Sequence, residues 1–341
     1  MQKPLHTAEE GKQGQAEIDA FKAAFTTLRD QVQTQFIGQG DLVNDLLSAL
    51  FAGGHVLLEG VPGLGKTMLV RTLSKALHLG YERIQCTPDL MPADIVGCMT
   101  LIETDHGGHK LVYQQGPVVS NFVLVDEINR ATPRTQSALL EAMQEGQVTV
   151  GTRTVPLPQP NIFIATQNPV EHEGTYPLPE AQIDRFMVKL LVQYPEPQDY
   201  PAIIDNTTGI TDPQVKAVIR GEEILAMRRA VRQVEISRPV LDYAVRLVVA
   251  TQPEHTTVDR VKEAVALGVS PRGVQALVVM GKVKALLDGR TSVSCEDLRT
   301  VALPSLRHRV LLSYRAAAKS ITQDQVIEAV LQSVPETAPV R

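Results

Sequence analysis

The sequence predicts an α/β protein with two parts, a doubly wound parallel sheet domain and a smaller helical domain after it. Three observations support this prediction. A glycine-rich motif occupies residues 60–67, short apolar runs alternate with helical patterns between 55 and 194, and the pattern from 221 onward is helical. Such alternation is typical of parallel sheets, because each connection between parallel strands crosses back over the sheet. A chain of 341 residues has room for about two such domains.

The N-terminal region is predicted to be helical after a flexible start. Residues 1–16 are polar and are expected to fray. Within 17–35 the apolar residues recur at the spacing of one helix face. They are Ile18, Phe21, Phe25, Leu28 and Val32. Residues 36–39 break the pattern, and a second helix then runs to about Ala52.

The glycine-rich motif Gly60-Val61-Pro62-Gly63-Leu64-Gly65-Lys66-Thr67 matches G-x-x-x-x-G-K-[ST] at every fixed position. An apolar run at 56–58 precedes it and a helical pattern from 66 to about 79 follows, which is the strand–loop–helix context that the motif needs. Glycines allow the backbone to wrap a triphosphate with its N–H groups pointing inward. Lys66 is expected to reach the β- and γ-phosphates, and the Thr67 hydroxyl to bind Mg²⁺. The motif therefore predicts ATP and Mg²⁺ as cofactors.

Five strands and two hairpins are expected in the sheet domain, whose predicted limits are 17–195. Most of the strands are continuous apolar runs, as in parallel strands that are buried on both faces. The strands are expected at 55–59, 82–86, 122–126, 161–166 and 187–192, with helices at 66–78 and 133–145. Alternating patterns around glycine-containing turns predict the hairpins. The hairpins pair 101–103 with 110–113 and 147–150 with 153–155.

Polar residues follow two of these strands. Asp126 and Glu127 end the strand at 122–126, and the carboxyl ends of parallel strands are where ligands bind. Asp126 can hold Mg²⁺ through water, and Glu127 can polarise a water for attack on the γ-phosphate. Asn168 follows the strand at 161–166 and can orient that water. The alternative for Asn168 is an Asx-turn before the proline that follows it.

Four arginines are candidates for contacts with phosphate or with another subunit. Arg185 precedes the last strand, too far along to join its own phosphate loop, and is expected to act as an arginine finger on a neighbouring subunit. The alternative is a surface salt bridge to Asp184 or Glu180. Arg272 lies at the start of a helix, where the helix dipole disfavours a cation. A nearby anion such as phosphate would offset this effect. Arg130 and Arg134 fit a subunit interface and a solvated face equally well.

The helical domain is predicted to span 221–335, after a linker at 196–220. Capping residues mark three of its helices. They are Ser237 with Pro239, Ser270 with Pro271, and Ser294 with Asp297; the helix that begins after Ser270 is expected to end at Gly289.

Composition narrows the function and the compartment. A net charge of −5, no Trp and 4% aromatic residues argue against an extended nucleic-acid surface. Cys86, Cys98 and Cys295 have no C-x-x-C spacing and are expected to be reduced thiols. The N-terminus has no apolar signal region, and no apolar run is long enough to span a membrane. The cytoplasm is the expected compartment.

The order of these motifs resembles the AAA+ ATPases, and within them the MoxR family of chaperone-like ATPases. The strings GVPGLGKT, VLVDEINRA, ATQNP, LPEAQIDRF and SPRG stand where that family carries its phosphate loop, acidic strand tip, sensor 1, arginine finger and sensor 2. The resemblance covers about residues 20–335. It implies catalytic roles for Glu127, Asn168, Arg185 and Arg272, and metal binding by Thr67 and Asp126. It implies nucleotide contacts at Ile37, Gly38, Gly60, Pro62, Gly63, Leu64, Gly65, Lys66, Thr67 and Met68. Whether Arg272 acts on its own nucleotide or a neighbour's stays open.

The resemblance also implies an assembly and a role. We expect a homo-oligomeric ring, most often a hexamer in this family, with the two hairpins lining its pore. Its work would be maturation of client proteins or metalloenzymes, or metal insertion, with a von Willebrand factor A domain partner. The partner is expected to be a separate protein, because few residues follow the helical domain.

Three other functions are alternatives to this interpretation. A nucleic-acid motor would need basic hairpins, and the first offers only Lys110 with His106 and His109, the second only Arg153. A motor subunit of a metal chelatase is closely related and stays open. A non-hydrolysing switch is disfavoured because the catalytic set is intact. The client and the direction of force are not predicted.

Overall fold

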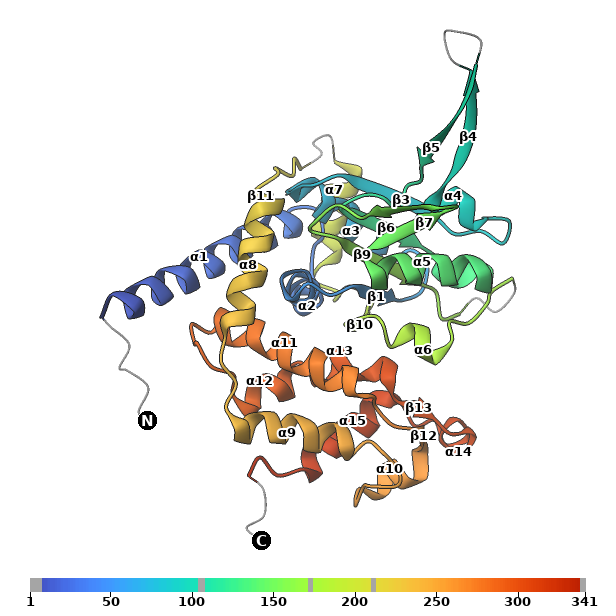
Figure 1. The fold of residues 1–341 in the computed structure, drawn as a ribbon. Helices are drawn as coiled ribbons and strands as arrows, with labels where there is room; N and C mark the ends of the chain where they lie inside the picture. The colour runs from blue at the N-terminus through green and yellow to red at the C-terminus, as the bar shows by residue number, and fades with distance from the viewer. Residues whose placement is uncertain (1–7, 104–107, 171–173, 210–212, 338–341) are drawn as a thin grey trace.

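The computed structural model describes residues 8–103, 108–170, 174–209 and 213–337. These ranges form a sheet domain and a helical lid (Figure 1). The lid lies beneath the sheet, on the side away from a long projecting hairpin.

The central sheet has five parallel strands. In sequence they are β1 (Val56–Glu59), β3 (Tyr81–Gln85), β6 (Phe122–Asp126), β9 (Ile162–Gln167) and β10 (Val188–Leu191). Their spatial order is β10-β1-β9-β6-β3, and every neighbouring pair is parallel. The doubly wound parallel sheet is therefore confirmed, and the carboxyl ends of all five strands lie at one edge of it.

Helices cover both faces of this sheet. The helices of this domain are α1 (Ala8–Gln33), α2 (Gly40–Ala52), α3 (Lys66–Ala76), α4 (Pro92–Val96), α5 (Pro133–Glu145), α6 (Glu180–Ile183) and α7 (Tyr200–Thr208), with a 3-10 turn η1 (Ile128–Arg130). Alternate residues of β6 enter two different cores, as the period of two along a strand requires. Phe122 and Leu124 pack with α1, α2 and α3, whereas Val123 and Val125 pack with α5.

Both predicted hairpins are present. The first pairs β4 (Gly97–Glu103) with β5 (His109–Gln115), and the second pairs β7 (Gln147–Val150) with β8 (Arg153–Pro156). The first hairpin projects far from the body of the molecule (Figure 1). Most of the turn expected at its tip lies outside the described residues. Gly151, in the tight turn of the second hairpin, has φ +61°, which a glycine adopts without steric cost.

The lid is built from helices and one short strand pair, with a further strand at its start that pairs with the sheet domain. Its elements are β11 (Ile219–Arg220), α8 (Gly221–Gln233), α9 (Arg238–Val249), α10 (Asp259–Ala264), β12 (Val265–Leu267), α11 (Pro271–Leu287), α12 (Cys295–Thr300), α13 (Ala302–Leu306), η2 (Arg307–Arg309), β13 (Leu311–Leu312), α14 (Tyr314–Ala318) and α15 (Gln323–Ser333). Strand β11 pairs with β2 (Leu77–His78) of the sheet domain, and β12 pairs with β13.

Some local predictions need correction. Helix α1 begins at Ala8 rather than 17, because most of the residues from Ala8 to Glu17 are good helix formers. The linker at 196–220 contains α7 and β11, and the lid is not wholly helical because it contains β12 and β13. Ser237 holds the N-cap position of α9, but its side chain makes no capping hydrogen bond.

The other two caps are formed as predicted. Ser270 accepts from the Arg272 N–H, and Ser294 and Asp297 form a reciprocal capping box. Gly289 follows the end of α11 with φ +82°. Among the helices of the described ranges, none is both long enough and apolar enough to cross a membrane.

Candidate active site

The glycine-rich loop joins β1 to α3 at the carboxyl edge of the sheet. Gly63 and Gly65 have φ +84° and +81°, so the loop depends on glycine at these positions. Helix α3 begins at Lys66 with no side-chain cap, which leaves the N–H groups of its first turn facing the loop. The Lys66 ammonium donates to the carbonyls of Gly60 and Val61. The loop thus offers backbone N–H groups and a cation to a phosphate chain.

The expected nucleotide contacts Ile37 and Gly38 directly follow Phe36, whose ring lies beside this loop. A side chain at Gly65 would come within 3.4 Å of the Phe36 ring. Gly38 has φ +76°, and a Cβ there would lie 2.3 Å from Asp199 Oδ2. Ile37 is half-buried, and Met68 is exposed on the first turn of α3. The fold therefore brings together the two stretches expected to hold nucleotide.

The two expected metal ligands are in contact. The Thr67 hydroxyl donates to Asp126 Oδ2 at 3.1 Å. Both groups are hard oxygen donors of the kind that Mg²⁺ prefers. No group of three or more His, Cys, Asp or Glu side chains suited to a metal occurs in the part of the chain that the structure describes. The oxygen pair of Thr67 and Asp126 fits Mg²⁺, which is usually held by one or two protein ligands together with phosphate oxygens.

Three residues that the sequence analysis did not single out organise the acidic strand tip. Thr166 on β9 donates to Asp126 Oδ1 at 2.6 Å and accepts from the Glu127 N–H at 2.8 Å. Arg83 on β3 donates to Asp126 Oδ2 at 2.7 Å. Gln85, two residues further along β3, donates to Glu127 Oε2 at 3.0 Å. The sequence could have indicated Arg83 and Gln85, because they are polar residues at alternate positions of an expected strand.

Glu127 has an unusual backbone conformation. Its φ and ψ are +57° and +50°, in the left-handed region that residues other than glycine rarely adopt. Such strain persists only where surrounding contacts impose it, and it is often found at functional sites. The Thr166 hydroxyl on its N–H is one such contact. Arg130 lies 3.8 Å from the Glu127 carboxylate, and Arg134 is exposed in the first turn of α5.

Asn168 forms the Asx-turn that was the alternative for it. Its Oδ1 accepts from the Val170 N–H, which is the Asx-turn. Its Nδ2 is buried with no hydrogen-bond partner among the described residues. Because an unpaired buried amide is costly, this donor is suited to a group that the protein itself does not supply. The turn fixes the amide so that its N–H groups stay available.

Cys86 lies behind the acidic tip. Burial, together with the charges of Asp126 and Glu127, raises the pKa of its thiol to about 12. The thiol therefore stays protonated near neutral pH and is not a nucleophile.

Arg185 and Arg272 lie at the opposite edge of the sheet. Both line a cavity of about 710 Å³ together with Gly54 and His55, which precede β1, whereas the phosphate loop follows β1. A strand of four residues separates the two ends by about 13 Å. Arg185 donates to Leu140 O at 3.1 Å, and Arg272 contacts Asp184 at 3.5 Å. Neither arginine is therefore brought to the phosphate loop of its own chain.

The chain matches two parts of a known ATPase architecture. Residues 55–188 match the ATPase family associated with various cellular activities (AAA), and residues 258–330 match the AAA lid domain. Over 305 residues the chain is 44% identical to "Chaperone MoxR1" of Mycobacterium tuberculosis strain H37Rv, covering 89% of this chain and 80% of that protein. The chain belongs to the MoxR family of AAA+ ATPases.

Two further relatives of this MoxR-family chain cover nearly its whole length. It is 32% identical to "Protein MoxR" of Methylorubrum extorquens over 346 residues, covering 94% of this chain and 98% of that protein. A solved structure, named "putative ATPase from Cytophaga hutchinsonii ATCC 33406", superimposes with a TM-score of 0.87 at 39% identity, covering 96% of this chain and 98% of that one. The AAA match includes the phosphate loop, the acidic strand tip, Asn168 and Arg185, and the lid match includes Arg272.

Proposed function

We propose that this MoxR-family ATPase hydrolyses ATP to ADP and phosphate, with Mg²⁺, in a homo-oligomeric ring that remodels protein clients. One observation supports the proposal of a ring. The expected catalytic groups divide between two edges of the sheet, with Glu127 and Asn168 at the carboxyl edge and Arg185 and Arg272 at the amino edge. A complete site then needs the amino edge of a second copy against the carboxyl edge of the first. In this arrangement both arginines act on the neighbour's nucleotide.

Each residue at the carboxyl edge has a role that follows from its position. Lys66 and the N–H groups of α3 hold the phosphates, and Thr67 and Asp126 hold Mg²⁺, which neutralises charge on the β- and γ-phosphates when bound. Glu127 accepts a proton from the attacking water. The Asn168 amide donates to that water or to the γ-phosphate. Arg185 of the neighbour stabilises charge that develops in the transition state.

The exposed side chains of the projecting hairpin favour contact with protein clients over contact with nucleic acid. Met99, Leu101, Ile102 and Leu111 are exposed on its two strands, and Leu101 and Leu111 are paired opposite each other. Exposed apolar side chains on a projecting element are typical of surfaces that contact protein. The name of the relative "Chaperone MoxR1" agrees with this role. A von Willebrand factor A domain partner, a metalloenzyme client and a cytoplasmic location are parts of the same proposal.

The assembly is tested by mixing two inactive variants. Arg185→Ala should bind ATP but lose hydrolysis by a factor of about 10³ or more. Glu127→Gln should also bind ATP without hydrolysing it, yet it keeps Arg185. Mixed rings should regain activity, because a Glu127→Gln subunit supplies Arg185 to an Arg185→Ala neighbour that has Glu127. Mixtures that stay inactive although they co-assemble would contradict the shared site.

The client role is tested by capture. Glu127→Gln loaded with ATP is used as bait, and Lys66→Ala, which should not bind ATP, is the matched control. Retention of a von Willebrand factor A domain protein or a metalloenzyme only by the first bait supports the chaperone role. Recovery of a porphyrin-binding subunit would instead indicate a chelatase motor.

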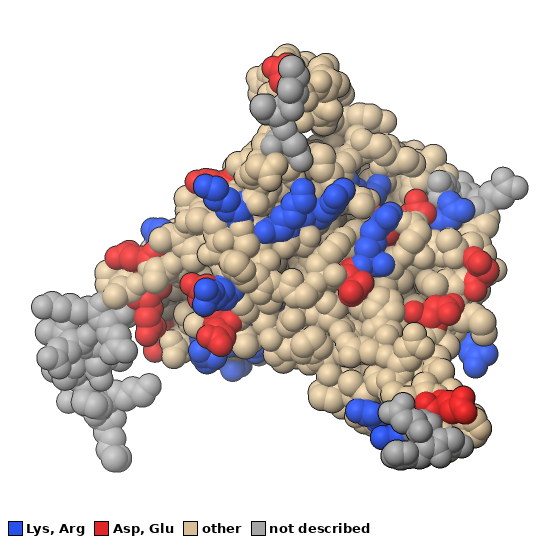
Figure 2. Space-filling view, turned by 90° about the horizontal axis from the view of Figure 1, so that it is seen from above, with Lys and Arg blue, Asp and Glu red and all other residues tan. Residues whose placement is uncertain are grey.

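A nucleic-acid motor is a second candidate, and one observation favours it. Figure 2 shows Lys and Arg side chains gathered in a band across the face from which the hairpin projects. ATP hydrolysis stimulated by DNA or RNA, and lost on Lys110→Ala, would support this candidate. Hydrolysis that is unchanged by nucleic acid would exclude it.

A further inference from the structure

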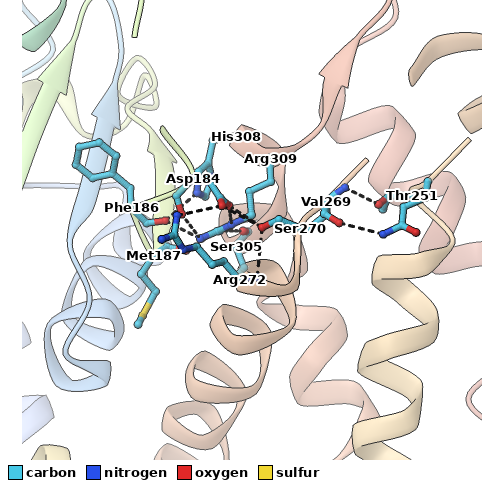
Figure 3. A network of polar contacts seen from close by, with 11 residues as sticks. Asp184, Phe186, Met187, Thr251, Val269, Ser270, Arg272, Ser305, His308 and Arg309 are labelled. Carbon is cyan, nitrogen blue, oxygen red and sulfur yellow. Dashed lines mark hydrogen bonds and ion pairs between the residues drawn. The ribbon is translucent and has the colours of Figure 1, made fainter. Parts of the chain in front are cut away.

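The segment that carries Arg185 is held by the lid. Residues 184–187 lead from α6 into β10, and their main-chain and side-chain groups accept hydrogen bonds from η2 and from the start of α11 (Figure 3). These lid residues lie more than eighty positions further along the chain, as the separation of 86 between Asp184 and Ser270 illustrates. The contacts therefore join two domains.

Asp184 is the point at which the lid contacts converge. Its Oδ1 accepts from Arg309 Nε at 2.9 Å, and the Ser270 hydroxyl lies 3.1 Å from Oδ1 and 3.0 Å from Oδ2. Arg272 Nη1 lies 3.5 Å from Oδ2. The anion expected beside Arg272 is thus supplied by the protein itself. Ser270 acts twice, since its hydroxyl oxygen also caps α11.

Arg309 is buried and serves almost entirely to hold main-chain carbonyls. Its Nη2 donates to Phe186 O at 2.7 Å and to Asp184 O at 3.2 Å, and its Nη1 donates to Met187 O at 3.1 Å. Burial lowers the pKa of its guanidinium to about 10, while Asp184 opposes that shift. Arg309 therefore remains charged at neutral pH, with Asp184 as its counter-ion.

The neighbouring lid residues extend this grip along the chain. The ring of His308 bonds to Phe186 O at 3.0 Å, and Arg307 donates to Lys189 O at 3.3 Å. Three consecutive lid residues thus hold the backbone on both sides of Arg185. A shift of η2 relative to the sheet has to move this backbone or break several hydrogen bonds.

The side chain of Arg185 is held much more loosely than its backbone. One bond, from Nη1 to Leu140 O, fixes its guanidinium, and its Nε is buried without a partner among the described residues. An unpaired buried N–H is unfavourable. If the guanidinium moves to an external anion, it therefore gives up only the hydrogen bond to Leu140 O within its own chain. The backbone around Arg185 is therefore fixed by the lid, while its side chain is able to change position.

We propose that Asp184 and Arg309 are positioning residues that fix Arg185 to the lid, so that the lid of one subunit sets the place of the arginine presented to the next subunit. This inference rests on the proposed function, in which Arg185 acts on a neighbour's ATP. Neither Asp184 nor Arg309 lies at the phosphate loop; Arg309 acts through Arg185, and Asp184 acts through Arg185 and through its contact with Arg272. Lid movement in one subunit is thereby linked to hydrolysis in its neighbour.

The test uses full-length Asp184→Asn and Arg309→Lys. The first removes the counter-ion, and the second keeps the charge but loses the planar fork that reaches several carbonyls. Misplacement of a catalytic group by about 1 Å costs on the order of 10²-fold, so kcat should fall about 10- to 100-fold. KM for ATP and the affinity for a fluorescent ATP analogue should not change, because the phosphate loop is untouched.

Mixing experiments separate positioning from simple damage. An Asp184→Asn subunit beside a Glu127→Gln subunit receives a correctly placed Arg185, so hydrolysis should recover in mixed rings. Asp297→Asn is the matched control. Asp297 is more buried than Asp184 (2% against 18% exposed) and pairs with Arg290 at 2.6 Å, but both residues of this pair lie within the lid. Asp297→Asn should lower thermal stability, and mixing it with Glu127→Gln should not raise its kcat.

The outcomes distinguish the inference from the function beneath it. Recovery with Arg185→Ala but not with Asp184→Asn overturns the positioning role and leaves the shared site standing. Failure of both mixtures, in rings that do assemble, overturns the shared site. If Asp184→Asn does not fold, Ser270→Ala removes only the lid hydroxyl, with the helix cap Thr322→Ala as its control. Wild-type kcat in Ser270→Ala and Arg309→Lys would also overturn the inference.

Discussion

Thr166→Val should destabilise the protein and slow hydrolysis without touching nucleotide. Thr166 is fully buried, and valine keeps its shape while removing the hydroxyl. Two bonds are lost, the 2.6 Å donation to Asp126 and the 2.8 Å acceptance from the Glu127 N–H. A bond to a charged group contributes about 1.5–3 kcal/mol, and a buried N–H without a partner costs about 1–3 kcal/mol. Because both involve one oxygen they do not simply add, and we expect a loss of about 2–4 kcal/mol.

The loss has two readouts. A change of 1 kcal/mol shifts Tm by about 2–4 °C in a domain of this size, so thermal unfolding should move down by about 5–15 °C. Without Thr166 the strained Glu127 backbone can relax, and a displaced catalytic carboxylate should lower kcat about 10²-fold. Both effects are measured on the same preparation, by circular dichroism and by phosphate release.

Thr166→Ser is the matched control, because it restores the hydroxyl at the cost of one methyl group. It should recover most of the activity and lose about 1 kcal/mol of stability. If Thr166→Val has the Tm of the wild type and hydrolyses ATP at the wild-type rate, Thr166 does not hold the acidic strand tip in place.

Two further predictions concern the phosphate loop and a buried histidine. Lys66→Ala should abolish ATP binding, measured with a fluorescent analogue, whereas Lys75→Ala on the same helix should not; tight binding by the first variant would refute its role. His55 accepts from the Phe163 N–H through Nδ1 and contacts Met143 O through Nε2, and burial lowers its pKa to about 4. The unfolded chain, with an ordinary histidine pKa near 6.5, then binds the proton more readily, so this contribution to stability is complete above pH 6.5 and is lost as the pH falls toward 4. Up to about 3 kcal/mol of the pH dependence of unfolding should be absent in His55→Gln, with exposed His78→Gln as the control; identical pH profiles for wild type and His55→Gln would contradict this assignment.

Much of the site was predictable because it is encoded locally. The phosphate loop needs glycine where φ is positive and a lysine and threonine at the start of a helix, and these requirements lie within eight consecutive residues. Asp126 and Glu127 were predictable because a run of buried apolar residues that ends in acids marks the carboxyl end of a parallel strand. The observed strands differ from the predicted ones by a residue or so at their ends.

Contacts between strands were not predictable in the same way. Thr166 reaches Asp126 because β9 pairs with β6, and Arg83 reaches it because β3 pairs with β6 on the other side. Strand order is decided by which helices cover which face of the sheet, and nothing within a single strand records it. The strand pair β12–β13 in the lid was missed for the same reason, since its strands are two or three residues long and lie far apart in the chain.

The sequence by itself determined the residue types, the local elements and the family, because short motifs impose their own backbone conformations. Only the tertiary structure decided that Arg272 lies at the same edge of the sheet as Arg185, opposite the phosphate loop. It also supplied Asp184 as the anion beside Arg272, from 88 residues away. The physical reason is that the edge on which a residue lies depends on the direction of a parallel strand within the packed sheet. The contact between Asp184 and Arg309 likewise exists only once the lid has docked on the sheet domain and buried the Arg309 guanidinium.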